Sequence, residues 1–347
     1  MSKKFFARYL FAVSAAALLF VGAGSTAKAA ETDVIYQGAW SETNPTITWT
    51  TTTPEATAKA AKICYTTDAN ITKPADATEY TATAITLNGL SGSATLTGLT
   101  TNTNYTVWIT DTNKTTVIAK GTVKTYPSVT NFRPTAYYAT RNDVDLAWTK
   151  GANTEGLYFA IQDDDGDWES EEEFSSTSTA YKNGVLEDLS IDRDSVTWAK
   201  ITPYVTVKKD ANTSVNLKGD TVQLPLFAQP FVNEKKDNYD ISLKGGKLKM
   251  TWQKVSGVSG YYIYASTKRH DGYKKVKTIS SNSKNPSAKF KFKNKKFSNS
   301  KTYYICVTAY KTVNGSIKES SGHYVYMFKG GDSYMTFSTY DFNKGNR

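Results

Sequence analysis

Apolar and polar residues alternate along most of the chain after residue 31, and no long stretch repeats its apolar residues at the helical period. Alternation of this kind predicts β-strands with one buried face. Three alternating segments each end in a tryptophan, at Trp49, Trp148 and Trp252, and these lie 99 and 104 residues apart. One strand tryptophan per 100 residues or so is typical of tandem β-sandwiches. We therefore predict an all-β chain of three tandem sandwiches.

The segments after each tryptophan align with one another. Superposing Trp148 on Trp252 without a gap places Leu157, Phe159 and Ile161 on Tyr261, Ile263 and Ala265. The first unit reaches this register after a short insertion, which brings Ala61, Ile63 and Tyr65 to the same positions. Further along, Tyr105 and Tyr303 each begin an alternating segment, six residues after Leu99 and Phe297 respectively.

These features resemble fibronectin type III domains, in the form found on secreted Gram-positive proteins. The tryptophan of the second strand, the segment Gly260-Tyr261-Tyr262-Ile263 and the six-residue step to Tyr303 carry the resemblance. It implies that Tyr105 and Tyr303 form tyrosine corners, in which the hydroxyl bonds to upstream backbone. The middle unit lacks the corner tyrosine, and Pro203 takes the position of Ala309. We expect an Ig-like variant there, with an edge or a bulge at the proline.

Composition divides the chain into five segments. We expect a signal peptide over 1–30, a fibronectin type III-like domain over 31–127 and a divergent Ig-like or fibronectin type III-like domain over 128–228. A basic fibronectin type III domain over 229–330 and a tail over 331–347 follow, the tail being either an extra strand or a ragged end. Pro225 and Pro230 favour a stiff, extended joint between the second and third domains.

The first thirty residues have the pattern of a secretory signal. Lys3, Lys4 and Arg8 precede the apolar run 10–24, and Ala27-Lys28-Ala29 offers small residues for cleavage after Ala29 or Ala30. The alternative is a membrane anchor, but the run is shorter than the roughly 20 residues that a span needs. We expect a secreted protein, extracellular or at the cell surface.

Histidine and cysteine are scarce, with two of each in 347 residues. This excludes a disulfide scaffold and a four-Cys zinc site, and leaves little material for histidine catalysis. Three sandwiches would also occupy almost the whole chain after residue 31. We expect no catalytic residues, no enzyme activity and no cofactor apart from the calcium considered below. Cys64 and Cys306 should lie in different domains, face outward and form no intramolecular disulfide.

Charge is segregated along the chain. The formal net charge is −2 over 31–127, −8 over 128–228 and +16 over 229–347. The lysines of 289–297 alternate with phenylalanines, which predicts an exposed basic strand at a sheet edge. We expect an anion-binding site there for a wall polymer or acidic glycan rather than nucleic acid, formed by Lys291, Lys293, Lys295 and Lys296. The alternative is that these lysines only guard the edge against pairing.

An acidic run over 163–173 suggests a calcium site. Its candidate ligands are Asp163, Asp165, Asp167 and Glu172, because calcium prefers several carboxylates. Residue 161 is isoleucine where an EF-hand loop would begin, so the run is not an EF-hand. The alternative, which we favour, is a solvated hairpin tip without a metal.

A third candidate is aromatic. Alternation places Tyr262, Tyr264 and Tyr304 on the outer face of two neighbouring strands, where they could form one patch. Such a patch would stack on sugars or anchor a protein. The alternative is cross-strand pairing or burial.

Together these observations predict a secreted, non-enzymatic binding, adhesion or spacer protein of the cell surface. Its partner would be an anionic wall polymer, a glycan or a surface protein. The rival prediction is the accessory, carbohydrate-binding part of an extracellular polysaccharide-degrading system.

Overall fold

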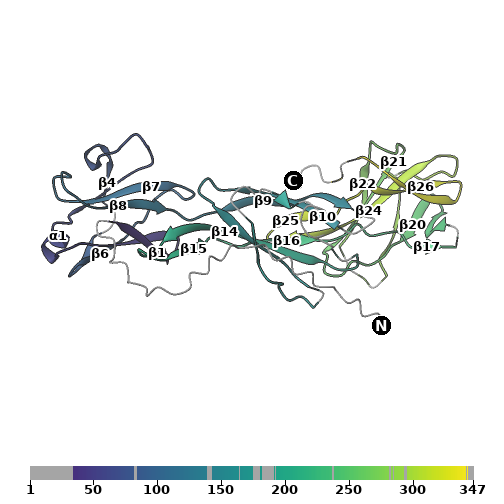
Figure 1. Ribbon diagram of the computed structural model, residues 1–347. Helices are drawn as coiled ribbons and strands as arrows, with labels where there is room; N and C mark the ends of the chain where they lie inside the picture. The colour runs from purple at the N-terminus through teal and green to yellow at the C-terminus, as the bar shows by residue number, and fades with distance from the viewer. Residues whose placement is uncertain are drawn as a thin grey trace.

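The strands of the chain form three β-sandwiches arranged end to end in an elongated molecule (Figure 1). The computed structural model describes residues 34–81, 84–138, 143–163, 165–174, 180–181, 191, 193–236, 238–280, 283, 285–292, 295–340 and 342. The predicted signal segment, 1–30, lies outside these residues. Within them, no helix has the length and apolar character needed to cross a membrane.

The first domain packs two four-stranded sheets, in the orders β1-β2-β6-β5 and β4-β3-β7-β8. A short helix, α1 (Pro54–Ala58), is capped by the Thr53 side chain, which accepts a hydrogen bond from the N–H of Ala56. A 3-10 turn, η1 (Pro74–Asp76), precedes β4. The strands are β1 (Ile35–Ser41), β2 (Asn44–Thr50), β3 (Lys62–Thr66), β4 (Thr78–Tyr80), β5 (Thr86–Asn88), β6 (Ser91–Thr95), β7 (Asn104–Thr110) and β8 (Val117–Lys124).

The middle domain packs the sheet β13-β10-β9 against the sheet β12-β11-β14-β15, in which β16 also pairs with β14. Strand β14 is long enough to pair with β16 along its first half and with β15 along its second half. The strands are β9 (Val129–Tyr138), β10 (Asp143–Lys150), β11 (Gly156–Ile161), β12 (Glu172–Phe174), β13 (Ala180–Tyr181), β14 (Thr197–Lys208), β15 (Ser214–Lys218) and β16 (Val222–Leu226).

The third domain packs the three-stranded sheet β19-β20-β23 against the larger sheet β22-β21-β24-β26-β27, with β25 beside β24 and a small β17-β18 ribbon. Part of its tail is the extra strand that the sequence allowed: 332–337 forms β27, which pairs with β26. The strands are β17 (Glu234–Lys235), β18 (Asn238–Tyr239), β19 (Ile241–Lys244), β20 (Lys247–Thr251), β21 (Gly260–Ser266), β22 (Lys274–Ile279), β23 (Ser287–Phe290), β24 (Tyr303–Val313), β25 (Ser316–Glu319), β26 (Tyr324–Lys329) and β27 (Asp332–Phe337).

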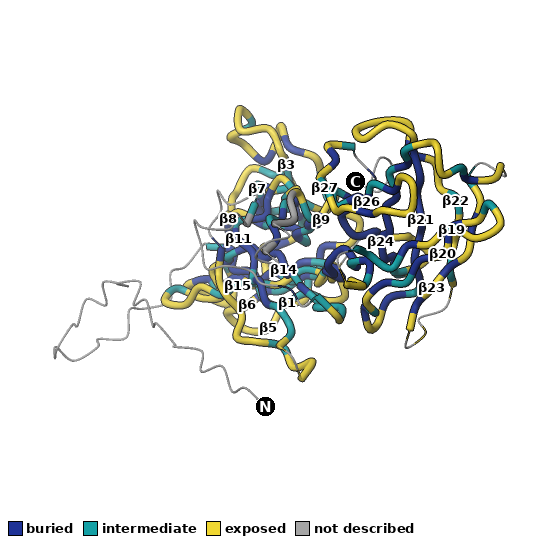
Figure 2. The backbone as a smooth tube through the Cα atoms, turned by 90° about the vertical axis from the view of Figure 1, so that its right-hand side faces the viewer, coloured by how far each residue is buried: buried dark blue, intermediate teal, exposed yellow. Residues whose placement is uncertain are grey.

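Each sandwich has its own hydrophobic core, which contains the predicted strand tryptophan. Figure 2 shows that the strands carry most of the buried backbone positions and that exposed loops surround them. Trp49, Trp148 and Trp252 are 1%, 3% and 1% exposed. Phe227, which the sequence assigned to the middle domain, is buried in the core of the third. The next residue, Ala228, lies in the core of the middle domain, so the two cores meet at these residues.

The strand registers agree with the alignment made from the sequence. Leu157 lies opposite Pro203 in the middle domain, and Tyr261 lies opposite Ala309 in the third. The carbonyl of Pro203 accepts a hydrogen bond from Gly219 at 2.8 Å, between β15 and β16. A strand residue directs its N–H and C=O to the same edge, so the missing N–H of proline faces this interruption in the neighbouring strand. Strand β14 pairs with β11 without a register shift, so Pro203 lies at an interruption between β15 and β16 rather than at the predicted edge or bulge.

Candidate functional site

Exposed lysines cover the outer face of the β-sheet β19-β20-β23. We call four of these lysines, Lys244, Lys247, Lys249 and Lys289, the basic sheet. Strand alternation buries Leu248, Met250 and Phe290 below them. In this register Lys244 lies opposite Lys247, and Lys249 lies opposite Lys289. Directly opposed side chains have Cβ atoms about 4.5–5.5 Å apart, so each pair holds two like charges at a destabilising separation.

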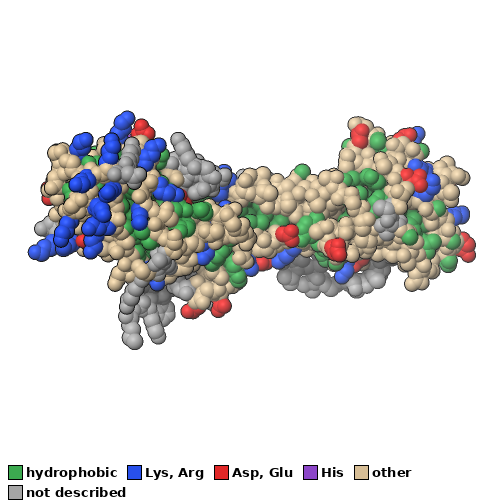
Figure 3. All heavy atoms as spheres, turned by 180° about the vertical axis from the view of Figure 1, so that it is seen from behind, with side chains coloured by type: hydrophobic (Ala, Val, Ile, Leu, Met, Phe, Trp, Pro, Cys, Tyr) green, Lys and Arg blue, Asp and Glu red, His purple; other side chains and the backbone are tan. Residues whose placement is uncertain are grey.

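No nearby carboxylate neutralises the basic sheet in the described part of the third domain. The one ion pair there is on the other sheet, between Lys268 and Asp271 at 3.7 Å, and both side chains are largely exposed. Figure 3 shows Lys and Arg side chains gathered over this end of the molecule. The described lysines of the basic sheet are therefore presented to solvent rather than paired with carboxylates.

The predicted lysines continue this surface beyond the end of β23. Lys291, Lys295 and Lys296 are exposed, whereas Lys293 lies outside the described residues. The chain reverses after Phe292, which exchanges backbone hydrogen bonds with Lys295 at 3.1 and 2.7 Å. These lysines therefore do not follow one straight strand, as alternation suggested, but surround a tight turn. β23 is an edge strand, as predicted.

Sequence reasoning missed the lysines of the β19-β20 hairpin. Lys247 and Lys249 alternate with the buried Leu248 and Met250, so the same period-two argument would have found them. Lys296 connects the two groups, because its side-chain stem packs against Gly246. Gly246 has φ of +75° and lies so close to Lys296 that a Cβ there would clash.

The described residues of the acidic run form a hairpin tip between β11 and β12. One carboxylate oxygen of Asp163 accepts hydrogen bonds from the backbone N–H groups of Asp165 and Asp167, at 3.1 and 2.8 Å. Glu172 lies in β12 opposite Phe159. Among the described residues, no three Asp, Glu, His or Cys side chains are close enough to hold a metal ion.

The predicted aromatic patch is covered by the tail. Tyr262 and Tyr264 are 6% and 9% exposed, and Tyr304 is half-buried. The ring of Phe342 lies 5.2 Å from that of Tyr264 and 4.8 Å from that of Tyr273. The expectation of an exposed patch is therefore wrong. The tail after β27 folds back over the outer face of the sheet and buries it.

A carboxyl group is buried within this covered face. Oε1 of Glu319 accepts hydrogen bonds from the hydroxyls of Tyr264, at 2.8 Å, and Thr308, at 2.5 Å. Burial raises the pKa of Glu319, although the two hydroxyls and the charge of Lys275 oppose the shift. The Lys275 Nζ lies 3.1 Å from the centroid of the Tyr262 ring rather than against the carboxyl. The group therefore favours its neutral form more than an ordinary glutamate does.

Both thiols are free and lie in different domains, yet neither is accessible. Cys64 and Cys306 do point away from their sandwich cores, as alternation predicted, but each is 0% exposed. Trp108 and Ala77 cover Cys64, and the tyrosine face and the tail cover Cys306. Burial raises the pKa of both thiols. An outward direction from the core therefore does not make either thiol accessible for pairing between molecules.

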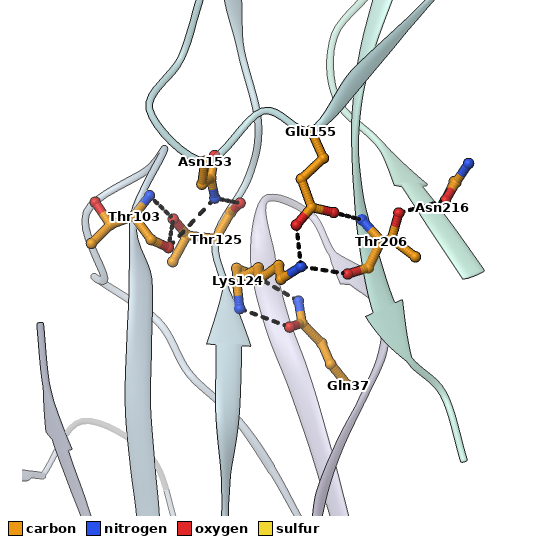
Figure 4. A network of polar contacts seen from close by, with 8 residues as sticks. All are labelled: Gln37, Thr103, Lys124, Thr125, Asn153, Glu155, Thr206 and Asn216. Atoms are coloured by element: carbon orange, nitrogen blue, oxygen red, sulfur yellow. Dashed lines mark hydrogen bonds and ion pairs between the residues drawn. The ribbon is translucent and has the colours of Figure 1, made fainter. Parts of the chain in front are cut away.

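The joint between the first two domains is held by a polar network (Figure 4). Lys124, at the end of β8, forms an ion pair with Glu155 and donates a hydrogen bond to the Thr206 carbonyl at 2.8 Å. The other oxygen of Glu155 accepts from the N–H of Thr206 at 2.8 Å. Gln37 completes the network with two hydrogen bonds to the backbone of Lys124, at 2.7 and 2.9 Å.

Close backbone contacts add to this joint. The hairpin β14-β15 of the middle domain extends along the first domain, where the Trp40 indole N–H donates to the Lys218 carbonyl at 3.0 Å. The amide of Asn153 is buried and donates to the Thr125 carbonyl at 2.6 Å. A Cβ on Gly219 would lie 2.3 Å from the carbonyl oxygen of Pro127. The two domains are therefore fitted too closely to hinge without breaking contacts.

The second joint is held by buried groups of the linker. Gln229 is 5% exposed and its amide bridges to the backbone of Tyr324, donating to the carbonyl at 2.7 Å and accepting from the N–H at 3.0 Å. A loop of the middle domain pairs with a turn of the third, through Val196 N–H to Ser256 at 3.1 Å. Together with buried Phe227, these contacts make this joint stiff as well.

Comparison with known proteins adds a likeness in fold. No family model matches the chain, and no curated protein matches it. Among solved structures, the chain is similar to the FN1–FN3 domains of chicken CNTN1, at 15% sequence identity over 86% of this chain and 99% of that chain, with a TM-score of 0.25. The assignment of fibronectin type III-like sandwiches therefore depends on the sheet topology, and on the hydrogen bonds that the Tyr105 and Tyr303 hydroxyls accept from upstream backbone N–H groups.

Proposed function

We propose that this chain is a secreted, non-enzymatic protein of the cell surface, a stiff spacer whose third domain holds an anionic wall polymer or acidic glycan. The observation that carries the proposal is the basic sheet, where Lys249 lies directly opposite Lys289 with no carboxylate between them. Like charges held at this separation cost stability in the free protein. A polyanion bound across both strands would offset that cost.

The two joints support the spacer role. A spacer must keep its ends apart, and both joints fix neighbouring domains through buried hydrogen bonds and apolar contacts. The uneven distribution of net charge among the three domains supports the binding role. It is −10 over the first two domains and +16 over the third, so an anionic surface attracts one end of the molecule only.

Secretion is proposed from the sequence of residues 1–30. The charged start, the short apolar run and Ala27-Lys28-Ala29 support cleavage after Ala29 or Ala30. N-terminal sequencing of protein from culture supernatant tests this part. A chain that keeps Met1, or that is found only inside cells, contradicts it.

Retention of the full chain on immobilised polymers tests the binding role. Teichoic acid and heparin should retain the protein at low salt and release it as salt rises, because bound lysines displace counterions. A neutral glucan should not show this salt dependence. Replacing Lys247, Lys249 and Lys289 by Gln should weaken retention at least about tenfold, a loss of roughly 1.4 kcal/mol.

The matched control replaces three exposed lysines of the other domains, Lys59, Lys73 and Lys209, by Gln. It removes the same formal charge and should leave retention nearly unchanged. Equal loss in the two triple variants would show that net charge alone is responsible, and would reject the basic sheet as a site.

A further inference from the structure

The larger sheet of the third domain extends beyond the smaller one. β27 is added at the end of the sheet, next to β26, while the facing sheet has only β19, β20 and β23. Met335 lies opposite Tyr326, and Phe337 lies opposite Tyr324, so both point to the core side of the sheet. Yet Met335 is 40% exposed and Phe337 is 47% exposed, because no strand of the facing sheet covers them.

A cleft of about 470 Å³ lies under this uncovered end of the sheet. That volume falls within the range of small-molecule sites, about 300–1,000 Å³. Its lining residues come from the start of the third domain, from the segment after β20, and from strands β26 and β27. They are Phe231, Val232, Asn233, Glu234, Tyr239, Gln253, Tyr326 and Met335.

Aromatic rings continue the wall of the cleft. The ring of Phe231 lies 5.4 Å from that of Tyr324, edge to face, and Tyr324 in turn lies 6.3 Å from Phe337. Tyr239 and Tyr326 form another edge-to-face pair at 4.8 Å. Because Phe231 and Tyr324 are half-buried and Phe337 is exposed, the rings form a partly open apolar wall.

Polar groups lie at the rim of this wall. The carboxylate of Glu234 and the amide of Gln253 are both exposed. Gln253 is fixed beside the aromatic wall, because its backbone N–H donates to the Phe231 carbonyl at 2.8 Å. The Arg193 guanidinium lies 4.6 Å from the centroid of the Phe231 ring, one of the rings of this wall.

We propose that this cleft binds a pyranose unit of a neutral polysaccharide. The C–H faces of a sugar ring pack against aromatic and thioether side chains, and its hydroxyls both donate to a carboxylate and accept from an amide or guanidinium. Glu234 is the one charged residue among those that line the cleft, so the cleft disfavours an anionic ligand. A second copy of this chain fits poorly, because two third domains of +16 would repel each other.

Titration calorimetry of the full chain tests the proposal with four neutral probes: cellohexaose, xylohexaose, mannohexaose and maltohexaose. At least one should bind, and its affinity should be the same at low and high salt. This separates the cleft from the basic sheet, where binding depends on salt and on Lys289. Failure of one site therefore leaves the other intact.

Two neighbouring residues of β27 give a matched pair of variants. Met335→Lys places a charged chain in the cleft and should lower affinity at least about tenfold, or roughly 1.4 kcal/mol. Tyr334→Lys places the same chain on the opposite face of the same strand, where Tyr334 is 53% exposed, and should leave affinity within a factor of two or so. Glu234→Gln should also weaken binding, without adding bulk.

Three results would overturn the proposal. One is that no probe binds at millimolar concentration. The second is that Met335→Lys and Tyr334→Lys change the affinity equally. The third is that a bound probe is released by salt, which would place it on the lysines instead.

Discussion

The hydroxyl of Tyr303 accepts a hydrogen bond from the backbone N–H of Ser298 at 3.2 Å. The first domain repeats this relationship: the Tyr105 hydroxyl accepts from the N–H of Thr100 at 3.1 Å. In both domains the tyrosine is buried and bonds to the residue five positions upstream. This is the tyrosine corner implied by the resemblance to fibronectin type III domains.

Tyr303→Phe should destabilise the chain by about 1 kcal/mol, because the N–H of Ser298 loses its acceptor in a partly buried position. Thermal unfolding of the full chain measures this. Tyr304→Phe is the control, since Tyr304 lies on the other face of the same strand and the corner does not involve it. An equal loss of stability in the two variants would show that the hydrogen bond of the corner hydroxyl adds no stability of its own.

The sequence predicted the fold because two strong periodicities coincide. Alternation at period two predicted which face of each strand is buried. The repeated tryptophans and corner tyrosines predicted how the chain divides into domains. It predicted an edge or a bulge at Pro203, whereas the proline lies where the neighbouring strand is interrupted, because it lacks the N–H that a continuous strand would need. The same argument, applied to Lys247 and Lys249, would have located more of the basic sheet.

What the sequence did not predict are contacts between distant segments. Alternation placed Tyr262 and Tyr264 on an outer face, but an outer face is exposed only if nothing covers it. Phe342 covers it, and no local pattern relates a residue near the C-terminus to strand β21. The joint at Lys124 and Glu155 was missed for the same reason, because the two residues belong to different domains.

Lys289→Thr should have opposite effects on stability and on binding. Threonine suits a strand and removes the like charge opposite Lys249, so the melting temperature should rise slightly at low salt. Retention on heparin should fall, because one lysine of the basic sheet is lost. Thermal unfolding and heparin elution, each at two salt concentrations, give both results. A variant that loses both stability and binding would contradict the repulsion between Lys249 and Lys289.

Glu319→Gln should stabilise the third domain at neutral pH. Both hydroxyls donate to the same oxygen of Glu319, and the carbonyl of glutamine can accept both bonds without a charge. Because the pKa of Glu319 is raised in the folded state, its stabilising contribution is full below the ordinary glutamate pKa and is lost as pH rises through the folded value.

The gain from Glu319→Gln should therefore be seen at pH 7 and disappear near pH 4. At pH 7 we expect a rise of roughly 2–4 °C in melting temperature, as about 1 kcal/mol produces in chains of this order of size. Thermal unfolding at the two pH values measures it. Glu234→Gln, which changes an exposed carboxylate, is the control. A gain in melting temperature that is larger at pH 4 than at pH 7 would show that the pKa of Glu319 is lowered, not raised, in the folded state.

Neither cysteine should react with a thiol reagent in the native protein, because Cys64 and Cys306 are both fully buried. Truncation before Ser338 should release Cys306 alone, since the tail covers it and not Cys64. Alkylation followed by mass spectrometry identifies the modified residue. Rapid labelling of Cys306 in the intact chain would show that the tail does not cover this face.

Lys124→Met should loosen the joint between the first two domains. The substitution leaves the partly buried Glu155 without its cation and the Thr206 carbonyl without a donor. Spin labels at Lys73→Cys and Asp167→Cys, both exposed positions, report the distance between the two domains. The distance distribution should broaden in the variant, because orientations that the network excludes become accessible.

The control for this prediction is Lys120→Met, which removes the same charge from the same strand β8 but leaves the joint intact. Acid should mimic the effect of Lys124→Met. Burial would raise the pKa of Glu155, but the Lys124 and Thr206 bonds outweigh it and the pKa is lowered. The contribution of the pair is therefore present above the ordinary glutamate pKa and is lost as pH falls through the folded value. An equally narrow distribution in Lys124→Met would show that the close backbone contacts at Gly219 and Asn153 hold the joint without the ion pair.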